Sequence, residues 1–278
     1  MSSWQDNCPE DVLLDIRLAI EQVHPSWRPV VEQGLQQVHI ANPNYFSGLQ
    51  ASTYLPNQAR LFAAFSMPMN AVRYVLMGEG PYPRVESATG YCFMDGAVKS
   101  LWSDEEGGGL SKKVNRATSL RNFMKMLLVA FGHLQQDATT GAAVADIVAK
   151  LRQADSGYIQ SLEDLQDNLI AQGFLLLNAS LVFRADTAPV KDAKAWQPFL
   201  QTVLSALSQY QQAAAMRAPV LVLWGKIAEQ LRPMPEASVY EQICAEHPYN
   251  LSFIGNQTMQ DFFRPMDLLK KLPEGKIL

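Results

Sequence analysis

Three short apolar runs, at residues 74–77, 174–177 and 219–224, each end at a turn signal or a polar residue. A fourth segment, residues 240–245, is more mixed, and we also interpret it as a strand. Short runs rich in branched or aromatic side chains, bounded by glycine, proline or polar residues, are typical of buried strands. The pattern therefore predicts four strands, with Asn178 directly after the second.

Helical spacing of apolar residues fills much of the remaining chain. Residues 9–50 have apolar positions at helical intervals that Pro25 and Pro29 interrupt, so we expect a helical extension over residues 1–50 that packs on a main domain of residues 51–278. Further helices are predicted from 118 to about 131 with Thr118 or Ser119 as N-cap, twice within 142–172, and from 195 to about 209. The second helix within 142–172 begins near a capping box formed by Ser161 and Asp164.

A rigid loop follows the first predicted strand. Gly78 and Gly80 permit tight turns, while Pro81 and Pro83 fix the backbone. In an open α/β sheet, ligands bind beyond the carboxyl ends of the strands. The rings of Tyr82 and Phe93 are therefore predicted to face one another across a flat ligand.

Composition and charge restrict the chemistry. The net charge of −4 argues weakly against nucleic-acid binding, although a local cationic rim is enough for a small site. Residues 112–121 and the pair Lys191 and Lys194 are candidates for such a rim, with solvated surface as the alternative.

Three cysteines are too few for an iron–sulfur cluster, and the four histidines lack metal spacing, so we expect no cofactor and no metal. The polar first nine residues do not look like a signal peptide, which leads us to expect a cytoplasmic protein that does not enter a membrane.

The loop resembles the first signature of family-1 uracil-DNA glycosylases, which reads Gly-Gln-Asp-Pro-Tyr-His and continues to a Gly-x-x-Phe. The matching residues are Gly78, Pro81, Tyr82, Gly90 and Phe93. The departures lie in the middle of the loop. The family's water-activating Asp falls on Gly80, its His falls on Pro83, and Glu79 stands in the place of its Gln.

Three further segments resemble the same family, in the same order along the chain. The run that ends at Asn178 resembles Gly-Val-Leu-Leu-Leu-Asn, residues 223–226 resemble Leu-Trp-Gly-Ser with Lys226 in place of the Ser, and residues 247–252 resemble His-Pro-Ser-Pro-Leu-Ser. The segment around Ser119 resembles the family's phosphate-contacting Ser-Leu-x-Asn. The resemblance covers about residues 50–272.

This resemblance implies a role for each matching residue. Phe93 would stack on the base, Tyr82 would exclude a methyl group at C5, and Asn178 would read the uracil edge. The remaining roles follow from the other matching segments. His247 would stabilise the uracil anion, Leu251 would wedge into the base stack, and Ser119, Lys226 and Ser252 would contact phosphate.

The implied fold is a three-layer α/β/α arrangement around a parallel four-stranded sheet. The implied function is recognition of a flipped uracil-type base in single- or double-stranded DNA, with absent or weakened hydrolysis because Gly80 supplies no carboxylate and Glu79 is only a candidate stand-in. The alternatives are a non-catalytic DNA- or protein-binding module and a structural relic whose pocket now serves another flat heterocycle or nothing. We expect a monomer, and a protein partner is left open.

Overall fold

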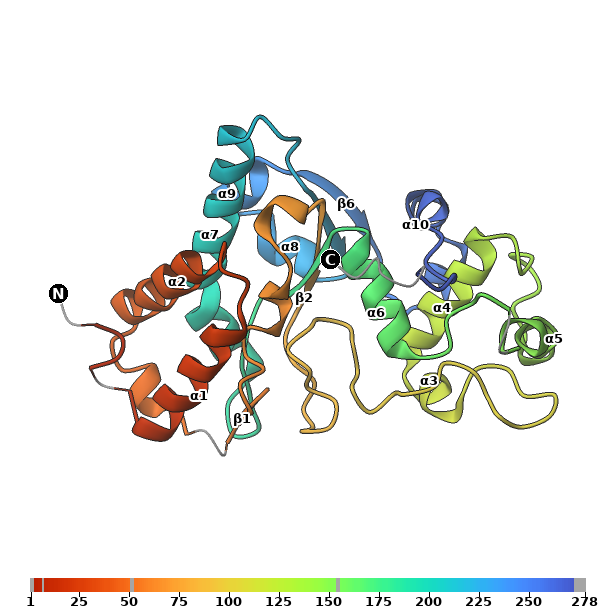
Figure 1. Cartoon of the computed structure of the whole chain (residues 1–278), viewed down its shortest axis with the longest axis horizontal. Helices are drawn as coiled ribbons and strands as arrows, with labels where there is room; N and C mark the ends of the chain where they lie inside the picture. The colour runs from red at the N-terminus through yellow and green to blue at the C-terminus, as the bar shows by residue number, and fades with distance from the viewer. Residues whose placement is uncertain (1–2, 7, 51–52, 154–155, 273–278) are drawn as a thin grey trace. The chain divides into compact units, whose positions relative to one another are not determined.

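The computed structural model describes residues 3–6, 8–50, 53–153 and 156–272 (Figure 1). The chain forms two compact units, which are described separately below. Unit 1 comprises Met1–Gly96, Gly173–Leu223 and Ile227–Ile243, and unit 2 comprises Ala97–Gln172, Trp224–Lys226 and Cys244–Leu278. None of the helices in the described ranges is long and apolar enough to cross a membrane.

A four-stranded parallel sheet with flanking helices is the main feature of the fold, as the sequence predicts. Its order is β3-β2-β5-β6. The strands are β2 (Tyr74–Gly78), β3 (Phe174–Asn178), β5 (Val220–Trp224) and β6 (Glu241–Ala245). Strand β2 runs parallel to both β3 and β5, and all residues of β3 and β5 are buried, as expected for a parallel sheet covered on both faces.

Helices of unit 1 come from both ends of its sequence. They are α1 (Glu10–Gln22), α2 (Arg28–Ala41), α7 (Pro189–Ala213), α8 (Ile227–Leu231) and α9 (Pro235–Ser238). Helices α2 and α7 lie side by side (Figure 1), so closely that a methyl group on Gly34 would lie 2.5 Å from the Phe199 ring. A short antiparallel pair of strands, β1 (Tyr54–Leu55) and β4 (Phe183–Arg184), was not predicted.

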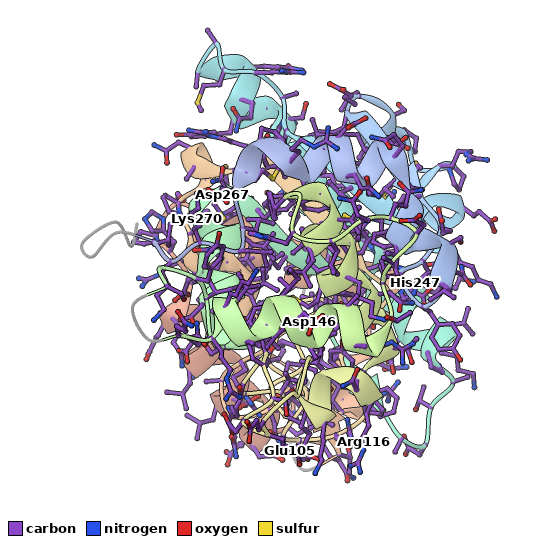
Figure 2. The ribbon with its side chains drawn as sticks, turned by 90° about the vertical axis from the view of Figure 1, so that its right-hand side faces the viewer. Glu105, Arg116, Asp146, His247, Asp267 and Lys270 are labelled. Carbon is purple, nitrogen blue, oxygen red and sulfur yellow. The ribbon has the colours of Figure 1, made fainter. Side chains whose placement is uncertain are left out.

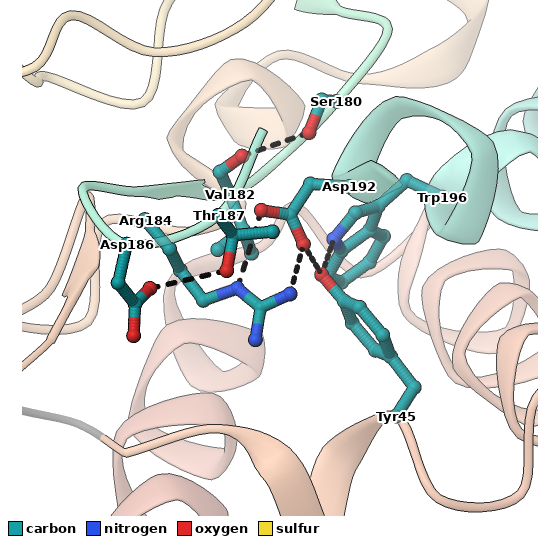
Figure 3. Close-up of polar contacts among 8 residues, drawn as sticks. All are labelled: Tyr45, Ser180, Val182, Arg184, Asp186, Thr187, Asp192 and Trp196. Carbon is teal, nitrogen blue, oxygen red and sulfur yellow. Dashed lines mark hydrogen bonds and ion pairs between the residues drawn. The ribbon is translucent and has the colours of Figure 1, made fainter. Parts of the chain in front are cut away.

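A buried ion pair joins β4 to α7, and a hydrogen bond from Tyr45 connects the segment after α2 to it. The Arg184 guanidinium donates to both carboxylate oxygens of Asp192, at 3.2 and 2.8 Å, and the Tyr45 hydroxyl donates to the same carboxylate at 2.7 Å (Figure 3). The Trp196 indole then donates to the Tyr45 oxygen at 2.9 Å. The nearly inaccessible Asp192 is thereby surrounded by donors, which a buried charge requires.

Unit 2 is mainly helical. Its α-helices are α3 (Lys112–Arg116), α4 (Thr118–Ala130), α5 (Gly141–Leu151), α6 (Leu162–Ala171) and α10 (Gln257–Phe263). Two short 3₁₀ helices, η4 (Leu251–Gly255) and η5 (Arg264–Met266), flank α10. The predicted capping box is confirmed, because Ser161 accepts from the Asp164 N–H and the Asp164 carboxylate accepts from the Ser161 N–H.

Several predicted helix boundaries are wrong, and proline explains two of them. Pro29 lies in the first turn of α2, where no intrahelical donor is needed, so it starts a helix instead of interrupting one. Pro189 similarly begins α7, six residues before the predicted start. The N-cap of α4 is Ala117 without a side-chain hydrogen bond, so neither Thr118 nor Ser119 has that role.

Candidate functional site

The loop after β2 is held beside the end of β3 by backbone hydrogen bonds. The Ala179 N–H donates to the Gly78 carbonyl at 2.8 Å, and the Ser180 N–H donates to the Glu79 carbonyl at 3.1 Å. These bonds continue the parallel pairing of β2 and β3 past the strand ends. Residues 78–80 therefore have a fixed position next to Asn178.

Gly78 allows three segments of unit 1 to meet. A methyl group on this residue would lie 2.6 Å from Asn178 Oδ1 and 2.7 Å from Cys92 Cβ, closer than real contacts permit. Cys92 is itself fixed above the sheet, because its N–H donates to the Leu176 carbonyl and its thiol donates to the Leu76 carbonyl. The absence of a side chain at residue 78 thus brings Asn178 and the segment that leads into Phe93 together.

Tyr82 and Phe93 are also brought together. The Tyr82 hydroxyl donates to the Phe93 carbonyl at 3.3 Å, and Phe93 has a positive φ of 66°. Burial, together with the nearby Asp95, raises the pKa of Tyr82 well above its ordinary value, so this hydroxyl remains a donor. A hydrogen bond therefore connects the two residues whose rings are predicted to flank a ligand.

Asn178 has a buried acceptor without a partner. Its Oδ1 receives no hydrogen bond from the described part of the chain, although the residue is almost inaccessible to solvent. An unpaired buried carbonyl of this kind costs about 1–3 kcal/mol. Such an atom is suited to receive an N–H from a bound molecule.

Glu79 and Gly80 line one pocket of unit 1. Its volume is about 630 Å³, and Ala179, Ser180 and Lys194 also line it. Tyr82, Phe93 and Asn178 do not line it, so the pocket lies on another side of the 79–81 loop. Gly80 has ordinary backbone geometry, and a methyl group there would meet Ser180 at 3.7 Å, an unstrained contact. A β-carbon therefore fits at residue 80 without strain.

In unit 2, the loop of residues 247–251 is held by a buried side chain. The Asn122 amide, on the first turns of α4, donates to the carbonyls of Pro248, Tyr249 and Asn250 at 2.8, 3.3 and 3.3 Å. Sequence reasoning missed this role and associated Asn122 with phosphate contact. The polar side chain in an otherwise apolar helix face was the available signal.

The same loop orients His247. The backbone N–H of Tyr249 donates to His247 Nδ1 at 3.0 Å, so the neutral imidazole carries its proton on Nε2. The backbone of Gly225 lies directly against His247, because any Cβ at residue 225 would lie 2.8 Å from His247 Cβ. Figure 2 draws His247 on the opposite side of unit 2 from the Asp267–Lys270 ion pair. A neutral imidazole with its proton on Nε2 can donate a hydrogen bond to an anionic oxygen.

An aromatic cluster underlies this part of unit 2. Trp224 packs against Phe123 and Phe253, with ring centroids 5.5 and 5.4 Å apart. Trp224 immediately precedes Gly225 and Lys226, while Phe253 immediately follows Ser252. The cluster therefore positions the segments that carry the predicted phosphate contacts, and Lys226 and Ser252 are both exposed.

Basic side chains of unit 2 are only partly available. Lys112 forms an ion pair with Glu105 at 2.7 Å, while Lys226 has no ion pair within the residues that the structure describes. Ser119 is half-buried in the first turn of α4, whose N-terminal N–H groups receive no side-chain cap. Within the described ranges, no group of three or more His, Cys, Asp or Glu residues is arranged to hold a metal ion.

The predicted site residues thus fall into two sets. Tyr82, Phe93 and Asn178 belong to unit 1, and His247 and the 251–252 segment belong to unit 2. Within each unit they are assembled by named contacts. That both sets line a single cleft stays a prediction.

Comparison with known proteins identifies the family. No family model matches the chain. The crystal structure of a UNG from Nitratifractor salsuginis is 35% identical, with a TM-score of 0.80, and the similarity covers 95% of this chain and 99% of that one. The uracil-DNA glycosylases of Corynebacterium glutamicum and Amoebophilus asiaticus are 27% and 24% identical, covering 92% and 84% of this chain and 91% and 90% of theirs. The chain belongs to the uracil-DNA glycosylase family.

Proposed function

We propose that this protein binds DNA, takes a uracil-type base into the site formed by Tyr82, Phe93 and Asn178, and cleaves its N-glycosidic bond slowly. The unpaired Asn178 Oδ1 carries this proposal. Relatives that match over nearly their whole length are named uracil-DNA glycosylases, which supports uracil-containing DNA as the substrate class. A base can only be read in this way after it has left the stack.

Base recognition follows from hydrogen-bond chemistry. The Asn178 oxygen accepts from the N3–H of uracil, and its amide nitrogen donates to O4. Cytosine has an unprotonated N3 and an amino group at position 4, so it presents the opposite pattern. It would leave the buried oxygen unpaired and is therefore rejected. Phe93 supplies the stacking surface, and Tyr82 occupies the space that a C5 methyl group needs.

The reaction needs stabilisation of two opposite charges. The bond from C1′ to N1 breaks, its electron pair leaves with the base, and water adds to C1′ and releases a proton. His247 donates its Nε2–H to the O2 of the departing anion. Gly80 has no carboxylate to position the water or balance the cationic sugar, so we expect weak turnover. Glu79, the residue before Gly80, is the candidate for a partial substitute.

The recognition step is tested with Asn178→Ala and single-stranded oligonucleotides that contain one deoxyuridine. We expect the variant to lose uracil-dependent binding, measured by fluorescence anisotropy, while its binding to the same oligonucleotide without uracil is unchanged. Equal binding of both oligonucleotides by the natural protein would contradict base reading at Asn178.

The chemical step is tested by restoring the carboxylate. Gly80→Asp should raise the single-turnover excision rate by about 10²-fold or more, because general-base and electrostatic groups contribute 10²–10⁴-fold. The dissociation constant should change little, since the group acts in the transition state. Gly80→Ala is the matched control and should leave the rate unchanged. Rapid excision by the natural protein that Glu79→Gln does not slow would contradict the missing-carboxylate account.

A further inference from the structure

Two neighbouring apolar side chains project from unit 2 into solvent. Tyr249 is 68% exposed and Leu251 is 69% exposed, although the next residues, Phe253 and Ile254, are buried. No hydrogen bond of the Tyr249 hydroxyl is found within the described residues. Isolated exposed apolar residues are common, but two on one loop next to a candidate catalytic histidine need an explanation.

The backbone beneath these side chains is rigid. Asn122 holds the carbonyls of residues 248–250, the Tyr249 N–H is bonded to His247, and the Asn250 N–H donates to the His247 carbonyl at 2.9 Å. Apolar side chains on a mobile loop would lose entropy on binding, whereas these already have a fixed origin. The loop therefore presents an aromatic ring and an aliphatic side chain to a partner at little ordering cost.

We propose that Tyr249 is a stacking surface for a DNA base adjacent to the nucleotide taken into the site. The proposal rests on the proposed function and adds a second base contact to it. It assigns to Tyr249 a role that the serine at this place in the family signature cannot have, because a hydroxymethyl group has no face on which a base can stack. Stacking on an aromatic ring is tolerant of sequence, so this contact favours any unpaired base.

The chemistry of the surroundings favours a nucleic acid over a protein partner. The loop begins at His247, which contacts the backbone next to the exposed Lys226. Two side chains form a patch far smaller than the roughly 800 Å² per partner of a stable protein interface. An exposed ring and an exposed cation on segments that meet at Gly225 and His247 are instead the combination used to bind single-stranded nucleic acid.

The contact should distinguish single-stranded from duplex DNA. In a duplex, the neighbouring base is paired and already stacked, so contact with Tyr249 requires unstacking. In a single strand, the base can turn onto the ring without breaking a pair. Tyr249 should therefore increase affinity for single strands more than for duplexes.

The experiment uses single-stranded oligonucleotides with 2-aminopurine on one side or the other of a deoxyuridine that carries a 2′-fluorine, which slows cleavage. Stacking on a ring changes the fluorescence of 2-aminopurine. Tyr249→Ala should weaken binding about tenfold and remove the fluorescence change, since stacking on an aromatic residue is worth about that factor. Tyr249→Phe should retain both, because the ring and not the hydroxyl makes the contact. Tyr210→Ala removes another exposed tyrosine, near the end of α7, and should change neither.

Salt dependence separates stacking from phosphate contact. Tyr249→Ala should leave the slope of binding against salt unchanged, while Lys226→Ala should reduce it by about one contact. If the natural protein binds DNA but Tyr249→Ala retains its affinity and fluorescence change, the stacking role is wrong and the proposed function stands. If the natural protein fails to bind DNA even at low salt, both are wrong.

Discussion

Asn178 and Asn122 are both buried asparagines, but they are used in opposite ways. Asn122 directs its amide N–H groups to three backbone carbonyls and fixes a loop of unit 2. Asn178 leaves its Oδ1 unpaired at the end of β3 in unit 1. Protein stability favours the first arrangement and opposes the second, which suggests that Asn178 is retained for binding. The bonded Asn122 amide supports structure, whereas the unpaired Asn178 Oδ1 is available to accept from a ligand.

The sharpest test of this comparison is Asn122→Leu. Leucine has the same branched shape but no donors, so three loop carbonyls lose their partner. We expect the free energy of unfolding to fall by about 3 kcal/mol, as each lost hydrogen bond is worth about 0.5–1.5 kcal/mol. Urea denaturation measures the change. A decrease below 1 kcal/mol would mean that the loop does not depend on this clamp.

The next test concerns the glycine that allows Asn178 its position. Gly78→Ala places a methyl group against Asn178 Oδ1 and Cys92 Cβ, and should destabilise the protein by about 2 kcal/mol through overpacking. Gly80→Ala is matched to it, because its methyl group meets only Ser180 at 3.7 Å, and it should be close to neutral. Equal effects of the two substitutions in thermal or urea unfolding would show that the close approach at residue 78 is not limiting.

Asn178→Leu should have the opposite sign to Asn122→Leu. It removes a buried oxygen without a partner, so we expect the protein to gain about 1 kcal/mol in unfolding free energy while losing uracil-dependent binding. The two measurements are made on the same sample, by urea denaturation and by fluorescence anisotropy. A loss of stability would indicate that Oδ1 has an internal partner and would remove the basis for the comparison.

The smallest effect on stability is expected at the exposed end of the loop. Tyr249→Ala removes a side chain that is 68% accessible, so the free energy of unfolding should change by less than about 0.5 kcal/mol. A larger loss would show that the ring packs against the protein. In that case its contribution to DNA binding could not be separated from folding.

Much of the sheet could be predicted from local sequence. The strands β2, β3 and β5 are apolar runs bounded by polar or turn residues, and their neighbours in space follow the usual rules for parallel sheets. The boundaries of α2 and α7 were missed because Pro29 and Pro189 were not recognised as first-turn residues. Two-residue strands such as β1 carry too little pattern to be detected.

The supports of the candidate site could not be predicted in the same way. Asn122 bonds to residues 126–128 positions further along the chain, and no local pattern encodes such a pairing. The crowding around Gly78 likewise depends on segments distant in sequence. Motif resemblance located Tyr82, Asn178 and His247, but only coordinates show which atoms around them are bonded and which are not.

The Asp192 cluster has a consequence for how this protein can change in length. Tyr45 supplies one of the donors that surround a carboxylate with almost no access to water, alongside Arg184. Depriving a buried ion pair of a partner typically costs about 3–5 kcal/mol, a large share of the stability of an ordinary domain, and the loss of Tyr45 would act in the same direction. Removal of Tyr45 would leave the Asp192 carboxylate with one donor fewer in a place that water does not reach. The N-terminal segment and α7 therefore stabilise one another through this carboxylate, and a truncation that removes Tyr45 should lower the free energy of unfolding.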